Sequence, residues 1–100
     1  MHLKKEDISK LVGQKIREIR LKKRLTIEEA AHNAGLEYTQ LSRIELGKIN
    51  TSIYHVFVIS ETLEVKLHEV FKEVYKQNGA AKNNEPKTRL SRKNNGQKNS

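Results

Sequence analysis

Apolar residues recur every three or four positions along roughly the first 77 residues, which is the spacing of one face of an α-helix. This pattern predicts five helices, at about residues 8–24, 26–34, 38–46, 52–63 and 67–77. Their apolar positions are Ile8, Leu11, Val12, Ile16 and Ile19; Ala30, Ala31 and Ala34; Leu41 and Ile44; Ile53, Val56, Phe57, Ile59 and Leu63; and Leu67, Val70, Phe71, Val74 and Tyr75. In the fourth segment β-branched residues favour a strand locally, but the period and the helical surroundings favour a helix. Gly13 lies inside the first predicted helix, which suggests a close contact with another helix there.

The stretch from Thr26 to Gly47 predicts two short helices joined by a tight turn. Thr26 and Glu29 match the capping box, in which each side chain bonds to the other residue's backbone N–H. A stripe of small residues at 30–34 permits close packing of another helix, and Gly35 can adopt the positive φ that ends a helix abruptly. Gly47 should end the second of the two helices. This arrangement is typical of a helix-turn-helix, which places its second helix in the major groove of DNA.

The outer face of the third predicted helix carries hydrogen-bonding side chains of moderate length. These residues are Tyr38, Thr39, Gln40, Ser42 and Arg43. Arginine can bond guanine through two hydrogen bonds, and glutamine can bond adenine in the same way. A short polar helix face is usually only surface, but its place after a capped, alanine-lined helix and a glycine turn makes it a candidate DNA-reading face.

The charge balance favours a polyanionic partner. Twenty Lys and Arg stand against twelve Asp and Glu, a net charge of +8. Residues 78–100 hold six basic residues and one acid, and they carry too few apolar side chains to fold, so we predict a basic, disordered tail. Such a tail favours nucleic acid without sequence preference, although it can equally be an ordinary soluble terminus.

Several classes of chemistry are not indicated. Without cysteine there is no disulfide or thiolate, and the histidines, at positions 2, 32, 55 and 68, lack the spacing of metal ligands on one helix face. Asp7 is the only aspartate, and the glycines form no phosphate-binding loop. We therefore expect no catalytic site, no metal and no small-molecule cofactor. No apolar run is long enough for a membrane span or a signal-peptide core, so we expect a cytoplasmic protein.

Residues 12–71 resemble the Cro and phage-repressor type of helix-turn-helix domain, also called the xenobiotic-response-element family. The resemblance rests on the stretches VGQKIREIRLKKRLTIEEAA, AGLEYTQLSRIELGK and ISETLEVKLHEVF. It implies a compact, all-α, five-helix domain of the lambda-repressor type over residues 1–77, with its helix-turn-helix at 26–47 and the disordered basic tail beyond.

The resemblance also implies roles for particular residues. Base contacts are implied for the third helix at Tyr38, Thr39, Gln40 and Arg43, with Ser42 on the same face. Places beside the DNA backbone are implied for Thr26, Ile27, Lys48 and Asn50. A buried ion pair is implied between Arg20 and Glu45, and a carboxylate is a suitable bidentate acceptor for an inward guanidinium.

Five positions depart from the family's usual residues. Ile27 stands in place of a DNA-contacting Gln, Ala30 in place of Leu, and Thr51 in place of Pro. Glu64 stands in place of Gly, so the fourth helix should end less sharply. Glu37 stands in place of Ser or Thr, and its charge favours the helix dipole but repels a nearby phosphate.

These features together predict a sequence-specific transcription regulator, such as a repressor, that binds double-stranded DNA as a homodimer. Two reading helices about 34 Å apart would then recognise the halves of a near-palindrome. The alternative is an antitoxin-type DNA-binding protein that neutralises a partner protein, with the tail as the segment that folds on that partner. A phage-type repressor, a restriction-modification controller and an antitoxin all remain open settings.

Overall fold

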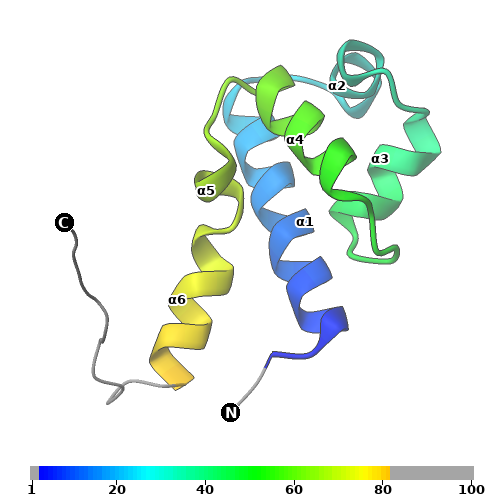
Figure 1. Cartoon of the computed structure of the whole chain (residues 1–100). Coiled ribbons are helices and arrows are strands. Elements are labelled where there is room, and N and C mark those ends of the chain that lie inside the picture. Colours follow the sequence, from blue (N-terminus) through cyan, green and yellow to red (C-terminus); the bar gives the residue numbers. More distant parts are fainter. Residues whose placement is uncertain (1–2, 82–100) are drawn as a thin grey trace, which may run out of the picture.

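The computed structural model describes residues 3–81, with side chains through residue 79. Over this range the chain forms helices and no strand, which confirms the predicted all-α fold (Figure 1). The helices are α1 at Lys5–Lys22, α2 at Ile27–Ala34, α3 at Tyr38–Glu45, α4 at Ile53–Thr62, α5 at Leu67–Val70 and α6 at Lys72–Ala81. The last helix extends beyond the predicted end at residue 77. Most of the predicted tail, residues 82–100, lies outside the described residues.

The long helix α1 is the central element of the domain. It packs against α3 on one side and against α5 and α6 on the other, while α2 contacts both α3 and α4 (Figure 1). The buried apolar residues come from every helix except α6. They are Val12, Ile16, Ala30, Ala31, Ala34, Leu41, Ile44, Val56, Ile59, Leu63 and Val70. The alanine stripe of α2 therefore faces the core, as its small residues predicted.

Some predicted apolar positions lie on the outside instead. Ile53 is 82% exposed and Phe57 is 49% exposed, and Leu67 and Tyr75 are exposed as well. The apolar residues of α4 cover too wide a part of the helix surface to face the core together. Of these, only Val56 and Ile59 are buried. The outer part of this apolar area is left as a hydrophobic surface.

The predicted fifth helix is interrupted at Phe71, which separates α5 from α6. Phe71 has φ −95° and ψ 5°, and it is half-buried against the core. The interruption lets Val70 be fully buried while α6 lies along α1 and packs Val74 against the core. The apolar residues of this segment therefore divide between two environments, since Val74 packs on the core and Leu67 and Tyr75 remain exposed.

A residue with left-handed backbone lies within two residues of the end of each helix from α1 to α4. Gly35 and Gly47 adopt φ 72°, as expected of helix-ending glycines. Arg24 and Glu64 adopt φ 62° and 60° without being glycine. The prediction of a less sharp end at Glu64 is wrong, because the N–H groups of residues 64 and 65 bond back to carbonyls of the last turn at 3.0 Å each. These hydrogen bonds form at Glu64 although a side chain is strained in the left-handed conformation.

Gly13 allows the backbones of α1 and α3 to touch. A Cβ atom added at this position would lie 2.7 Å from the carbonyl oxygen of Glu45, and the carbonyl oxygen of Ile44 would be closer still. Real Cβ atoms essentially never approach backbone so closely, and neither carbonyl belongs to a flexible side chain. The glycine in the first helix is therefore explained by this helix contact, which sets the distance between α1 and α3.

We expect Gly13→Ala to lower the free energy of unfolding by about 1–3 kcal/mol, because α3 must move away from α1 to admit the methyl group. The matched control is Gly79→Ala in α6, where an added Cβ meets nothing within 4 Å. Alanine there should leave stability unchanged or raise it by up to about 1 kcal/mol. Urea unfolding followed by circular dichroism measures both, and equal stability of the two variants would disprove the close contact.

Candidate nucleic-acid interface

Helix α3 is attached to the domain by one face and exposes the other. Leu41, Ile44 and Glu45 are buried, whereas Thr39 and Arg43 are exposed. The spacing of three and four residues that puts Leu41 and Ile44 on the inner side puts Thr39 and Arg43 on the opposite side. The polar positions selected from the sequence therefore occupy the outer face of a firmly packed helix.

A buried ion pair joins α1 to α3. Arg20 Nε donates to Glu45 Oε2 at 2.7 Å, and a second guanidinium nitrogen donates to Oε1 at 3.0 Å. The remaining nitrogen donates to the carbonyl oxygen of Leu25 at 2.7 Å. Arg20 and Glu45 are only 6% and 5% exposed. The hydrogen bonds to Glu45 raise the pKa of Arg20 and outweigh the opposing effect of burial, so the guanidinium is held in its charged form.

The predicted base-reading residues differ in how accessible they are. Tyr38 is 52% exposed, and Thr39 and Arg43 are exposed beside it, while Ser42 is half-buried. Gln40 is also half-buried, and its Nε2 lies 3.4 Å from Nδ1 of His55 on α4. The sequence pattern did not include His55 in this region, because only the fold brings the start of α4 near Gln40.

The start of α2 lies beside the start of α3. Thr26 Oγ1 accepts from the N–H of Glu29 at 3.0 Å, and the Glu29 carboxylate accepts from the N–H of Thr26 at 2.8 Å, so the predicted capping box is present. The next N–H groups, of Ile27 and Glu28, have no acceptor within the helix. Arg20, Thr26, Ile27, Glu28 and Tyr38 line a shallow hollow between the two helix starts. Such N–H groups and the positive end of the helix dipole are suited to an anion. The carboxylate of Glu28 at the rim of the hollow repels an anion.

The loop after α3 carries the exposed Lys48 and Asn50. At Gly47 an added Cβ would lie 2.7 Å from the Cα of Lys10, so this loop is pressed against α1. The contact brings the backbone of the basic residue Lys10 next to the predicted phosphate-contacting loop.

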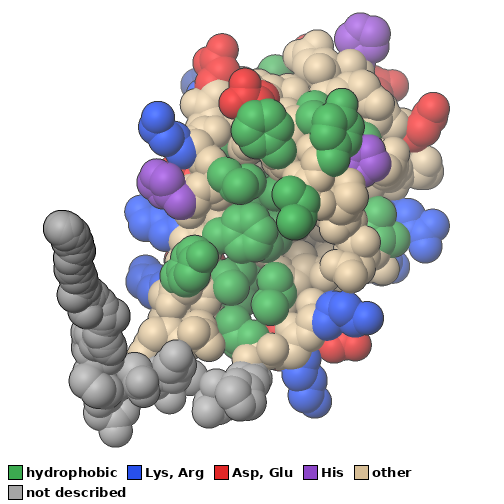
Figure 2. Space-filling model, in the orientation of Figure 1, with side chains coloured by type: hydrophobic (Ala, Val, Ile, Leu, Met, Phe, Trp, Pro, Cys, Tyr) green, Lys and Arg blue, Asp and Glu red, His purple; other side chains and the backbone are tan. Residues whose placement is uncertain are grey.

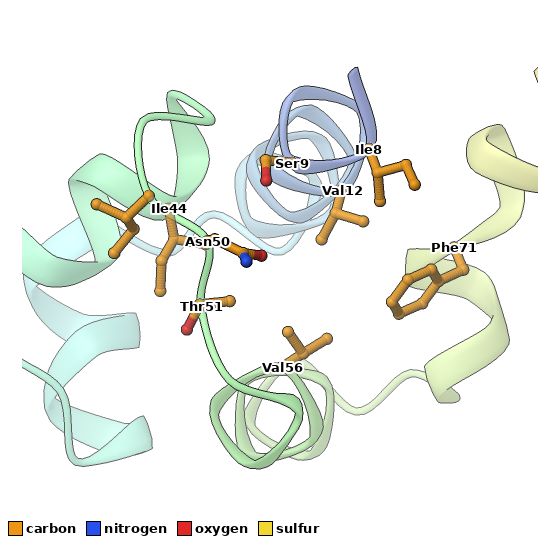
Figure 3. Close-up of a pocket in the computed structure, with 9 residues that line it drawn as sticks. Ile8, Ser9, Val12, Ile44, Asn50, Thr51, Val56 and Phe71 are labelled. Carbon is orange, nitrogen blue, oxygen red and sulfur yellow. The ribbon is translucent and has the colours of Figure 1, made fainter. Parts of the chain in front are cut away.

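Beneath this loop is a small apolar cavity of about 70 Å³ (Figure 3). Val12, Val56 and Phe71 point toward it from α1, α4 and the end of α5, and Asn50 and Thr51 form its edge at the loop. Ligand pockets generally measure roughly 300–1,000 Å³, so this space suits a packing defect better than a cofactor. Among residues 3–79 there is also no group of three His, Asp or Glu that could hold a metal. No helix of the described range is long and apolar enough to cross a membrane.

The paired short helices, the glycine turn and the polar outer face of α3 define a helix-turn-helix domain. A model of the helix-turn-helix family HTH_3 matches residues 16–70. The chain therefore belongs to this family of DNA-binding regulators, and the resemblance inferred from the sequence is confirmed.

Solved structures of three proteins are similar to this chain. The restriction-modification controller protein C.AhdI from Aeromonas hydrophila is 28% identical, with a TM-score of 0.62 over 63% of this chain and 96% of that one. The clp gene regulator ClgR from Corynebacterium glutamicum is 22% identical, with a TM-score of 0.67 over 77% of this chain and 84% of that one. An HTH_3 family transcriptional regulator from Vibrio cholerae is 17% identical, with a TM-score of 0.69 over 77% of this chain and 43% of that one. The latter two similarities concern the fold. No curated protein sequence matches the chain.

We expect Glu45→Ala to lower the free energy of unfolding by about 3–5 kcal/mol, because it leaves the buried charge of Arg20 without its partner. Glu18→Ala is the control, since Glu18 is an exposed carboxylate whose ion pair with Lys15 is on the surface of α1. That control should change stability by less than about 1 kcal/mol. Thermal and urea unfolding measure both variants, and similar small effects would show that the buried pair does not hold α3 in place.

Proposed function

We propose that this protein is a homodimeric transcription regulator, such as a repressor, that binds a near-palindromic operator with α3 in the major groove. The observation that supports this most directly is the outer face of α3. It carries exposed polar side chains on a helix whose inner face is fixed by Leu41, Ile44 and the ion pair of Glu45. Base reading requires side chains of this kind on a rigid support, and the family membership supplies the DNA-binding class.

In this proposal the contacts fall into two groups. Tyr38, Thr39, Gln40, Ser42 and Arg43 face base edges. Thr26, Ile27, Lys48 and Asn50 lie at the DNA backbone. Ile27 has no polar side chain, so it can meet a phosphate only through its N–H at the start of α2. Phosphate contacts set the position of the protein, and base contacts give the sequence preference.

A hydrophobic surface on α4 and α5 supports the homodimer. Ile53, Phe57 and Leu67 are exposed, and a hollow between the two helices is lined by Phe57, Val65 and Leu67. Figure 2 shows a band of hydrophobic side chains on the face where α4, α5 and α6 can be seen. The same hollow is bordered by Glu61, Glu64 and Lys66, which carry both signs of charge. A surface that is apolar at its centre and carries both charges at its edge can pair with its own copy about a two-fold axis.

The similarity to C.AhdI, a restriction-modification controller, supports a restriction-modification setting more than a phage or antitoxin setting. The antitoxin alternative assigns partner binding to the tail, most of which lies outside the described residues. No contact or surface among residues 3–81 favours that alternative over DNA regulation.

The proposal is tested by selecting binding sites from random DNA at a stated salt concentration. The wild-type protein should enrich a near-palindrome. Arg43→Ala should weaken the selected site by about 1–3 kcal/mol and relax the preference at one base position in each half. Lys48→Ala is the matched control, because losing a phosphate contact should weaken selected and random DNA alike and reduce the salt dependence. Failure of the wild-type protein to enrich any site would reject the proposal.

The dimer surface is tested with Phe57→Glu, which places a charge at its centre. We expect this variant to sediment as a monomer and to lose at least tenfold in affinity for the selected palindrome, since about 1.4 kcal/mol of lost pairing already has that effect. The control is Leu21→Glu on α1, where the side chain is 50% exposed, much like the 49% of Phe57. A dimeric Phe57→Glu protein with normal melting would place the dimer contact elsewhere.

A further inference from the structure

One side chain from outside the helix-turn-helix contacts a predicted base-reading residue. Gln40 Nε2 lies 3.4 Å from His55 Nδ1, and both residues are half-buried. We propose that His55 is a positioning residue that sets the orientation of the Gln40 carboxamide and thereby the base that Gln40 prefers. This inference rests on the proposed function, because it takes α3 as the helix that faces bases.

His55 is well placed to act as a fixed reference for Gln40. Its backbone N–H donates to Oγ of Ser52, the N-cap residue of α4, at 3.1 Å. Its ring lies against that of Tyr54, with centroids 5.7 Å apart and planes tilted by 57°. The next residue, Val56, is buried in the core. These contacts fix the backbone of His55 at the start of a packed helix, and Tyr54 borders one side of its ring, whereas an exposed glutamine side chain would be free to rotate.

The chemistry of the carboxamide explains why such a partner matters. A glutamine amide has two N–H groups and one oxygen, and its two ends differ only in whether they donate or accept. Recognition of adenine uses the oxygen, which accepts from N6, together with the N–H on the same edge, which donates to N7. The second N–H points to the other side and needs a separate acceptor. In the structure, the group beside the amide nitrogen is His55 Nδ1.

An amide N–H directed at the ring requires Nδ1 as its acceptor, which is the tautomer with the ring proton on Nε2. The oxygen and the remaining N–H of Gln40 then form an ordered acceptor–donor edge for the DNA. If the amide were reversed, the same two groups would face the base in the opposite order and would no longer match adenine in that pose. In this tautomer His55 favours one of the two orientations that a solvated glutamine adopts almost equally.

The experiment compares base preference among full-length variants selected against random DNA. Wild-type protein should enrich adenine at one position in each half-site, and Gln40→Ala should abolish that preference. His55→Phe keeps an aromatic ring but has no nitrogen, and it should reduce the adenine preference at this position about three- to tenfold, the effect of one neutral hydrogen bond. His55→Asn offers an amide oxygen near the place of Nδ1 and should restore the preference. In the Gln40→Ala background, His55→Phe should change nothing further.

Two results would overturn the inference. One is an undiminished adenine preference in His55→Phe, and the other is an equal loss at every base position, which would make His55 a general support of α4. Melting curves of each variant identify a loss that comes from unfolding. If wild-type protein selects no site, the proposed function fails before any substitution is made. If Arg43→Ala relaxes one position and Gln40→Ala relaxes none, the function stands and the role of His55 is rejected.

Discussion

One guanidinium group connects α3 to the rest of the domain. Arg20 bonds both carboxylate oxygens of Glu45 and also the carbonyl of Leu25, so α1, α3 and the turn before α2 meet at a single side chain. Lysine could not replace it, because an ammonium group lacks the two parallel N–H donors that bond both oxygens of a carboxylate. Being buried, the pair is also less weakened by salt than a surface pair is. Counterions are concentrated around DNA. A DNA-binding protein therefore benefits if the ion pair that orients α3 is not weakened by salt.

Small residues also allow α3 to pack closely on the rest of the domain. Gly13 lets α3 approach the α1 backbone, and the alanine stripe of α2 lets the core close around α3 and α4. Close approach allows the inner side of an eight-residue helix to be anchored by only two large aliphatic side chains, Leu41 and Ile44. The outer side is then not needed for contacts with the core and can be almost wholly polar. The domain thus separates the residues that hold α3 from those that face outward.

The features predicted from the residues alone are those with local signals, whereas the Arg20–Glu45 pair, 25 positions apart, is implied only by the family resemblance. The capping box at Thr26 and the glycine ends at Gly35 and Gly47 follow from short-range backbone chemistry. The outward positions of Ile53 and Phe57 could not be predicted, because a broad apolar arc does not indicate which part of it faces the core. The Gln40–His55 contact spans 15 positions and arises only when the fold brings the start of α4 near Gln40. The DNA contacts themselves remain predictions, since they depend on a partner molecule and not on the fold alone.

The left-handed residues Arg24 and Glu64 have a consequence for how this protein can evolve. Each carries a side chain in a conformation that disfavours one by about 1–2 kcal/mol, within a domain whose class is stable by only about 5–15 kcal/mol. Both residues are exposed, and neither is among the candidate DNA contacts. Single-codon changes to glycine at these corners would therefore offer a reserve of stability. A lineage could draw on that reserve to tolerate destabilising changes on α3, where a new operator preference would have to arise.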